Sequence, residues 1–238
     1  MTGVLTQRAT AATHVGTVRK RNEDAMLARD ELGLWAVADG AGGHGAGDVA
    51  SRAVIAALED MPAGLSAAEI LAQLRLRIGA VNGALLARSN AEGRARPMAT
   101  TVVMLVLRNG HYAALWAGDS RAYVLRAGAL LRVTRDHSLV QEMVEAGQLT
   151  EEEAEHHPQS NVITRAVGVE DALDLEKATG PVARGDRFLL CSDGLFKALP
   201  ETGVGAMLRD GADAESLIAA AVARGARDNV TAVIVTVA

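Results

Sequence analysis

The residues with the clearest chemical potential in this sequence are aspartates that lie next to apolar stretches. Asp39 and Asp193 each close an apolar run and are each followed by glycine. Asp119 follows another apolar run, Asp228 precedes the last one, and Asp24 ends a polar cluster near the N-terminus. Short apolar runs bounded by glycine are typical of buried strands. Carboxylates at the ends of several core strands could therefore converge on one edge of a sheet.

Converging carboxylates repel one another, so they need a cation in order to lie close together. A ligand set of oxygen atoms, without cysteine and with little histidine, favours Mg²⁺ or Mn²⁺ over Zn²⁺ or Cu²⁺. Gly40, Gly42 and Gly43 would let the backbone approach whatever Asp39 holds, because they carry no Cβ. Asp-Gly is also a common turn dipeptide. The spacing alone leaves both a set of turns and a metal site open.

Composition excludes several other classes of protein. The 238 residues are 49% hydrophobic and 3% aromatic, with a net charge of −5. A Lys/Arg block and base-stacking aromatics are lacking, which argues against a nucleic-acid partner. Cys191 is the single cysteine, which suits a reducing compartment. We see no signal peptide and no apolar run near the roughly 18 residues of a membrane span, so we expect a cytoplasmic protein without membrane contact.

The periodicity predicts strands and helices in separate blocks, which favours an α+β fold over a strictly alternating one. Without a Pro/Gly/Ser linker or a repeat, we expect a single domain, 1–238. The expected strands are 13–18, 25–28, 34–39, 100–107, 111–117, 122–125, 130–133, 174–178, 188–191 and 231–237. The expected helices are 47–58, a longer one from the Ser66 capping box to about Ala87, two short acidic ones within 138–158, and 216–223.

Taken in order, the motifs resemble the metal-dependent protein Ser/Thr phosphatases of the PPM (PP2C-like) family. The resemblance spans the chain and rests on these strings: GTVRKRNEDA from Gly16, VADGAGGH from Val37, ATT from Ala99, GDSR from Gly118, TRDHS from Thr134, NVITRAVG from Asn161, CSDGL from Cys191 and DNVT from Asp228. Ala41 stands where bacterial members usually carry Met, and Ala99 where the family usually has Gly. Neither position supplies a ligand in the family.

The resemblance implies a four-layer α-β-β-α sandwich with two central antiparallel sheets. It also implies a phosphoric monoester hydrolase that acts on phosphoserine and phosphothreonine in proteins with two Mn²⁺ or Mg²⁺ ions. The implied roles belong to seven residues: Asp39 bridges the ions, the Gly40 carbonyl completes one, Asp193 and Asp228 ligate the other, Asp24 binds the shared water shell, Asp119 serves a third ion, and Arg19 clamps the phosphate.

Several expectations are open at this point. The general acid is either a metal-bound water or His44 on the Gly-rich loop. The segment at about 138–165 lines up with the family's mobile flap. Short bacterial members of the family oppose a Ser/Thr kinase. We therefore expect a monomer whose partners are phosphoproteins, including the kinase or its substrates. Some of these members act in type VI secretion control. A phosphoprotein-binding module without catalysis and a small-molecule phosphatase are the alternatives.

Overall fold

Two antiparallel sheets form the centre of the structure, a computed structural model that describes residues 5–42 and 45–238. The first sheet has the strand order β1 (Gln7–His14), β11 (Val230–Val237), β10 (Arg187–Cys191), β7 (Arg121–Arg126) and β8 (Ala129–Arg132). The second has the order β2 (Asp24–Arg29), β3 (Leu34–Ala41), β5 (Val102–Arg108), β6 (His111–Ala117) and β9 (Glu176–Pro181), with β4 (Ala99–Thr100) paired to β3.

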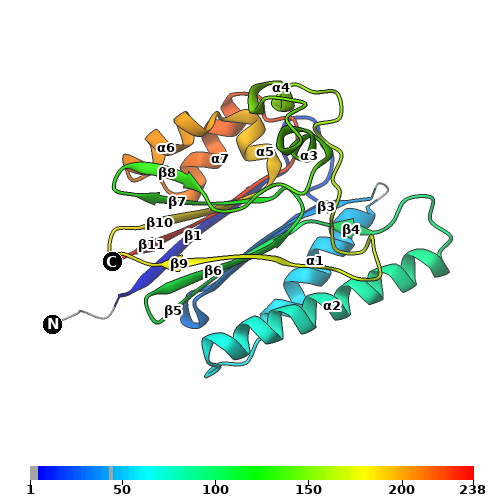
Figure 1. The fold of residues 1–238 in the computed structure, drawn as a ribbon, viewed down its shortest axis with the longest axis horizontal. Helices are drawn as coiled ribbons and strands as arrows, with labels where there is room; N and C mark the ends of the chain where they lie inside the picture. The colour runs from blue at the N-terminus through cyan, green and yellow to red at the C-terminus, as the bar shows by residue number, and fades with distance from the viewer. Residues whose placement is uncertain (1–4, 43–44) are drawn as a thin grey trace.

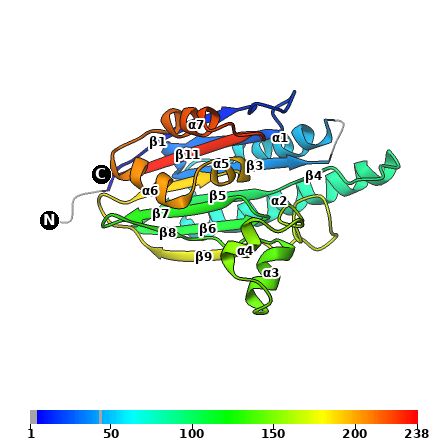
Figure 2. The ribbon, with the colours of Figure 1, turned by 90° about the horizontal axis from the view of Figure 1, so that it is seen from above.

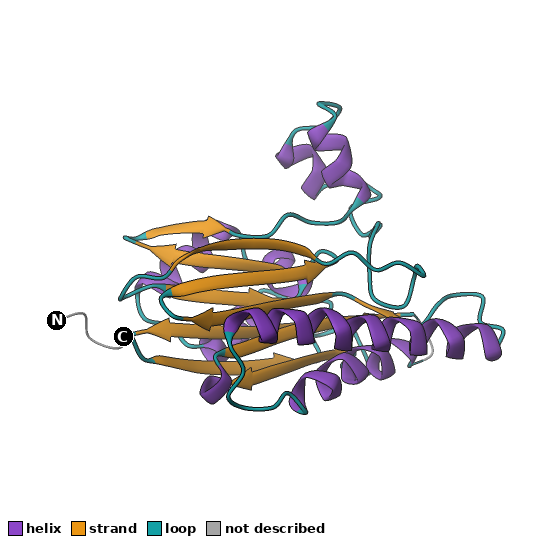
Figure 3. Ribbon diagram, turned by 60° about the horizontal axis from the view of Figure 1, so that its bottom comes forward, coloured by secondary structure: helices purple, strands orange, loops and turns teal. Residues whose placement is uncertain are grey.

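Helices cover the outer face of each sheet, so the predicted four-layer α-β-β-α sandwich is confirmed (Figure 1). On one side lie α1 (Ala46–Glu59) and α2 (Ala67–Ala91), and on the other α5 (Asp193–Ala198), α6 (Glu201–Arg209) and α7 (Ala214–Ala223). Figure 2 shows the same layers from above. The short helices α3 (Leu139–Glu145) and α4 (Glu151–Glu155) lie away from both sheets (Figure 3), and a 3₁₀ turn, η1, spans Asp30–Leu32.

The core between the sheets consists mainly of aliphatic side chains, in keeping with the scarcity of aromatics. Trp35, Val37 and Leu105 of the second sheet pack against Leu190 and Val233 of the first. Every residue of β3 from Leu34 to Ala38 is buried, because its other face packs under α1. This double burial explains the continuous apolar run that leads into Asp39.

Helix α2 begins at the predicted capping box and packs along one face only. The Ser66 side chain accepts from the Glu69 N–H, and the Glu69 carboxylate accepts from the Ser66 N–H. Among the described residues, α2 is the one helix long and apolar enough by length and composition to cross a membrane. From the sequence we expected no apolar segment near the length of a membrane span, and this finding corrects that expectation. A helix packed on a soluble core passes the same test, so the finding by itself assigns no membrane contact.

Three predictions of secondary structure differ from the structure. The first strand is Gln7–His14 rather than 13–18, because Gly16 has a φ of 80° and turns the chain. Strand β9 begins at Glu176 instead of Asp174. Helices α5 and α6 were not predicted: α5 has 6 residues, too few for a helical period to show in the sequence.

Glycines allow the segments that carry the aspartates to pack closely. A Cβ on Gly40 would lie 2.3 Å from the Gly47 carbonyl oxygen in α1, and one on Gly194 would lie 2.0 Å from the Asn229 carbonyl oxygen. A Cβ on Gly16 would lie 2.1 Å from the Asp228 carbonyl oxygen. Gly40 therefore serves the packing of α1 on β3, which differs from our expectation that it provides clearance beside Asp39.

We predict that Gly194→Ala lowers the free energy of unfolding by roughly 2 kcal/mol or more, because the new methyl group meets backbone that cannot rotate away. The matched control is Gly79→Ala in α2, where a Cβ meets nothing within 4 Å. That change should stabilise the protein by about 0.5–1 kcal/mol. Urea unfolding of both variants checks the pair, and equal stabilities would contradict the close contact at Gly194.

Candidate metal centre

The aspartates singled out in the sequence lie at one end of the sandwich, where β3 and β10 end and β2 and β11 begin. Asp24 and Asp39 are directly opposite each other in the β2–β3 ladder. Asp193 follows β10, and Asp228 precedes β11, the strand antiparallel to β10. Asp119 lies in the crossover from β6 in one sheet to β7 in the other. The antiparallel topology thus brings together carboxylates from distant parts of the chain.

Threonine hydroxyls fix the backbone of Asp39. Its N–H donates to Thr101 Oγ1 at 3.1 Å, and its carbonyl oxygen accepts from Thr100 Oγ1 at 2.8 Å. Thr101 Oγ1 also lies 2.7 Å from Ser120 Oγ, next to Asp119. Its backbone is thus held in place, while no side chain in residues 5–42 or 45–238 forms a hydrogen bond with the Asp39 carboxylate. Thr100 and Thr101 therefore do more than fill the core strand to which the sequence assigned them.

One oxygen of Asp24 is held and the other is left without a partner. Asp24 Oδ2 accepts from Ser192 Oγ at 2.8 Å and from Thr231 Oγ1 at 2.6 Å. Asp24 Oδ1 is buried and makes no hydrogen bond. A buried carboxylate oxygen without a donor is costly. Asp24 thus keeps a free oxygen in a region where Asp193 and Asp228 also act, which suits a cation or its bound water.

Asp119 has the same kind of free oxygen. Its carboxylate is buried, and Oδ1 has no hydrogen-bond partner. The preceding residue is held by His137, whose Nδ1 accepts from the Gly118 N–H at 3.1 Å and whose Nε2 lies 2.9 Å from Glu176. Nε2 must therefore carry the proton and donate to the Glu176 carboxylate. The ring of Trp116 stacks on His137 and holds it further.

The pKa values of the clustered aspartates reflect burial and the repulsion between neighbouring negative charges. Burial, followed by the charges of Asp24, Asp193, Asp119 and Asp228, raises the pKa of Asp39 well above its ordinary value. Burial also raises the pKa of Asp24 and of Asp119 to about 7, with Asp193 adding to both effects. All five aspartates therefore act on one small region. A cation there would remove the repulsion that these shifts reflect.

Two observations test whether these residues fit a metal. The orphaned oxygens of Asp24 and Asp119, and the field at Asp39, fit a divalent cation with oxygen ligands. In residues 5–42 and 45–238, however, no group of three or more Asp, Glu, His or Cys side chains is arranged so that it could hold a metal ion. Side chains that repel one another spread apart, and the orphaned oxygens of Asp24 and Asp119 remain available as ligands. The chemistry of the donors fits, and the carboxylates must draw in around the ion.

Arg19, the predicted phosphate clamp, forms a bidentate pair with Asp228. Its Nε donates to Oδ1 at 2.8 Å and its second terminal nitrogen, Nη2, to Oδ2 at 2.7 Å. The Arg19 side chain is 57% exposed, so the pair contributes little to stability. Arg19 therefore lies at the site, with the planar guanidinium that phosphate binding requires, and it must leave Asp228 in order to bind a phosphate.

Asn229 is a positioning residue to which the sequence reasoning gave no role. Its Oδ1 accepts from the Glu23 N–H, and its Nδ2 donates to the carbonyls of Val15 and Arg21. These bonds tie the loop that carries Arg19 to the loop that carries Asp228. The only available signal was its place in the DNVT string. Ser192, Thr231 and His137 also lie in quoted motifs, but their partners could not be read from those motifs.

The structure describes two of the remaining predicted residues, Asp193 and Gly40, but not His44. Asp193 begins α5, and its Oδ2 pairs with Lys197 at 2.5 Å. The N–H of Gly40 donates to the Glu23 carbonyl at 3.1 Å. His44 and Gly43 lie outside the described residues, so the role of His44 as general acid stays a prediction.

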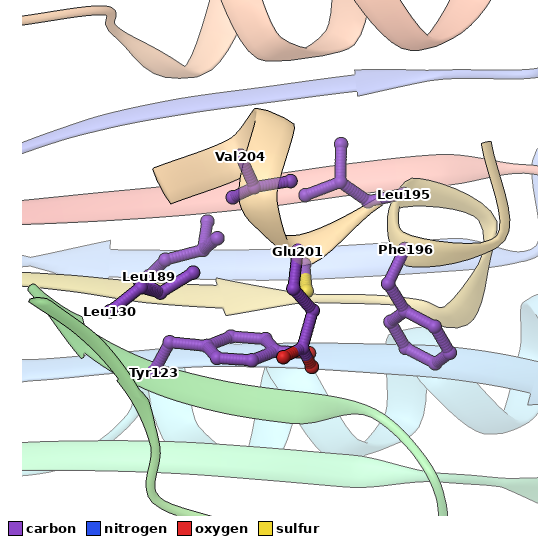
Figure 4. Close-up of a pocket in the computed structure, with 8 residues that line it drawn as sticks. Tyr123, Leu130, Leu189, Leu195, Phe196, Glu201 and Val204 are labelled. Atoms are coloured by element: carbon purple, nitrogen blue, oxygen red, sulfur yellow. The ribbon is translucent and has the colours of Figure 1, made fainter. Parts of the chain in front are cut away.

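Two cavities lie elsewhere in the described residues. The first, drawn in Figure 4, is an apolar gap beneath α5 and α6 that is too narrow for a water molecule. There the Tyr123 hydroxyl donates to Glu201 at 2.8 Å, and Phe196 lies under the guanidinium of Arg121. The second, of about 510 Å³, is lined by residues of the β7–β8 turn, β10 and α6 and contains no acidic residue. The acidic cluster is therefore the candidate site.

The fold and the acidic edge together define a class, that of α-β-β-α sandwiches with an oxygen-ligand metal centre. The profile of the family described as Protein phosphatase 2C matches residues 13–235, so this chain belongs to that family.

Solved structures and a curated relative agree with this assignment. The chain is similar to PppA, described as a key regulatory component of T6SS in Pseudomonas aeruginosa, with a TM-score of 0.90, 41% identity and coverage of 98% of both chains. A PstP catalytic domain in complex with 2 manganese ions matches with a TM-score of 0.84 and 36% identity over 98% of this chain and 99% of that one. Serine/threonine protein phosphatase PstP of Mycobacterium tuberculosis is 38% identical over 98% of this chain and 45% of its own length. The chain thus spans about half of that protein.

We predict that the metal-free protein loses stability as the pH rises from about 4 to about 7. Between the ordinary pKa of 3.8 and the raised value of about 7, folded Asp24 and Asp119 bind more protons than the unfolded chain does. Stability therefore falls with increasing pH. Thermal unfolding in EDTA at pH 5 and pH 7.5 measures the loss, and Mn²⁺ at pH 7.5 should reverse it.

Asp119→Asn tests the cause of this pH dependence. Removing one repelling charge should stabilise the metal-free protein at pH 7.5 by on the order of 2 kcal/mol and flatten its pH dependence. Asp210→Asn, at the end of α6, is the control and should leave the slope unchanged. A metal-free protein that is more stable at pH 7.5 than at pH 5 would contradict the repulsion.

Proposed function

We propose that this chain is a protein serine/threonine phosphatase that hydrolyses phosphoserine and phosphothreonine with two Mn²⁺ or Mg²⁺ ions. One observation carries the proposal: aspartates from separate segments meet at one end of the sandwich, and Asp24 and Asp119 each keep a buried oxygen without a partner in the described part of the chain. Such a cluster has no structural purpose without a cation. Membership in the protein phosphatase 2C family and the similarity to a manganese-bound PstP domain support this reading.

The family resemblance implies the role of each carboxylate. Asp39, at the centre of the field, would bridge the two ions, with the Gly40 carbonyl completing one of them. Asp193 and Asp228, from the edge of the other sheet, would ligate the second ion. Asp24 would orient the water shell through its free Oδ1, and Asp119 would lie at the position where the family resemblance implies a third ion. When bound, the ions supply a water of lowered pKa and neutralise charge on the phosphoryl group.

Arg19 would bind the substrate phosphate. Its guanidinium is planar and exposed, and it already makes a bidentate contact with a carboxylate, whose geometry resembles that of two phosphate oxygens. Asp228 would release Arg19 once its oxygens are engaged by an ion. Because the attacking group is water, the chain needs no nucleophilic side chain, and positioning with charge neutralisation supplies most of the catalysis.

The biological setting is proposed from the family and from the similarity to PppA. We infer that the chain acts in the cytoplasm as a monomer and removes phosphates placed by a bacterial Ser/Thr kinase on itself or on its substrates. PppA is described as a regulator of T6SS, and control of type VI secretion is the finer proposal for this chain. The net charge of −5 supports the absence of a nucleic-acid partner.

We predict that hydrolysis of p-nitrophenyl phosphate requires Mn²⁺ or Mg²⁺, stops in EDTA, and falls by at least about 100-fold in Asp39→Asn, because a neutral amide with a single oxygen replaces the negatively charged carboxylate. Steady-state kinetics with each metal measures this. Activity that survives both EDTA and the substitution would refute the mechanism, and inactivity with every divalent ion would favour a binding module. A higher kcat/KM on sugar phosphates than on phosphothreonine peptides would favour a small-molecule phosphatase.

We predict that Arg19→Ala raises KM for phosphate esters by roughly tenfold while Mn²⁺ affinity holds, because the lost contact is to the phosphate. Arg19→Lys should not restore KM, since an ammonium group cannot bind two oxygens in one plane. Arg184→Ala, an exposed arginine between β9 and β10, is the control for net charge. An unchanged KM in Arg19→Ala would remove Arg19 from the clamp role.

A further inference from the structure

Lys197 is a cation inside the acidic edge that neither the fold nor the proposed chemistry explains. It lies one helical turn after Asp193 in α5, and its ammonium group contacts Asp193 Oδ2 at 2.5 Å. The same ammonium lies 2.5 Å from Oδ1 of Asn161, which belongs to the flap segment 138–165. An ordinary i,i+4 pair on a helix has a single partner and is solvated. Lys197 instead joins two segments separated by 36 positions in sequence.

The charges around Lys197 are those of the candidate metal centre. Asp193, Asp119 and Asp39 all act on its ammonium group, and Lys197 in turn is a positive charge that acts on Asp119. Asp119 Oδ1 is buried without a hydrogen-bond partner. The Lys197 side chain is 38% exposed, so it reaches this region from the surface. It leaves Oδ1 of Asp193 free for a metal, because its contact is to Oδ2.

The flap is closed at its base by a backbone bridge, and Lys197 contacts the flap next to that base. Ser138 and Ile163 form an antiparallel bridge, with the Leu139 N–H donating to the Val162 carbonyl and the Thr164 N–H to the His137 carbonyl. Asn161 follows α4 and its side chain reaches Lys197 from there. Asn161 is exposed and lies beside Val162, whose carbonyl accepts a bond at the base of the flap, so the bond to Lys197 adds a side-chain contact there. The contact connects the flap directly to the carboxylate edge.

We propose that the Lys197 ammonium replaces a third divalent cation as the positive charge between Asp119 and Asp193, and that its bond to Asn161 connects the flap to this position. This inference rests on the proposed metal centre and concerns how many ions it takes. The ammonium supplies one positive charge where a weakly held ion would supply two. The chain then works with two ions at metal concentrations that would fill a third site in a chain lacking this lysine.

The experiment counts Mn²⁺ ions by isothermal titration calorimetry and equilibrium dialysis at pH 7.5, and needs no substrate. The wild type should bind two ions per chain. Lys197→Gln should bind a third with at least about tenfold higher affinity than the wild type does, because a like charge has been removed. Lys197→Gln/Asp119→Asn should lose that ion again. Lys177→Gln, an exposed lysine on β9, makes the same change in net charge and should bind as the wild type does.

Lys197→Arg distinguishes a role of charge from one of shape. It keeps the positive charge and should keep the two-ion stoichiometry. Two ions in both the wild type and Lys197→Gln would overturn the inference while leaving the proposed function intact. A third ion in the wild type that depends on Asp119 would also overturn it. No Mn²⁺ binding by the wild type would overturn the inference and the proposed function together.

Hydrogen exchange of the flap amides tests the second half of the inference. In Lys197→Gln and in Asn161→Ala, the amides of 156–164 should exchange roughly tenfold faster than in the wild type, because a charge-assisted bond is lost. Asn161→Ala should leave the ion count at two, since the ammonium remains. Exchange unchanged in both variants would refute the fastening of the flap, and a purely structural lysine would leave the Mn²⁺ count unchanged.

Discussion

The constraint on which this structure depends is the mutual repulsion of carboxylates gathered at one end of the sandwich. Asp39 has four other aspartates acting on it, and burial adds to their effect. Each is held on its own rigid element: Asp39 by Thr100 and Thr101, and Asp24 by Ser192 and Thr231. The backbone cannot relax to separate them. The charges must therefore be compensated by protons, by basic side chains or by metal ions, and each has a different consequence for the protein.

The fold produces this constraint through its topology. Antiparallel strands place the end of one element beside the beginning of the next, so acids from the start of β2 and the end of β3 become neighbours. The crossover from β6 to β7 carries Asp119 from one sheet to the other at the same edge. Glycines at positions 16, 40 and 194 allow the backbones of these segments to touch. A side chain at any of these positions would widen the edge and move the acids apart.

How far the sequence predicts this site depends on the distance over which each interaction acts. The apolar runs ending in Asp39 and Asp193 and the Ser66 cap are local patterns, and the structure contains all of them. The bonds of Thr231 to Asp24 and of Asn229 to Val15 join positions 207 and 214 residues apart. No local pattern specifies such partners. The resemblance to a family identified the aspartates, while the residues that hold them became visible only in the structure.

Helix α5 illustrates why the remaining elements could not be predicted. Its 6 residues give no periodicity, and its place is fixed by contacts to other segments. Gly194 packs against the Asn229 carbonyl, and Phe196 lies under the Arg121 guanidinium, which also binds Asp136 at the entry to the flap. Because one short helix carries Asp193, Phe196 and Lys197, a shift of the flap or of Arg121 changes the position of a metal-ligand candidate. The positions of Asp193 and Lys197 therefore depend on contacts between segments that no pattern within α5 specifies.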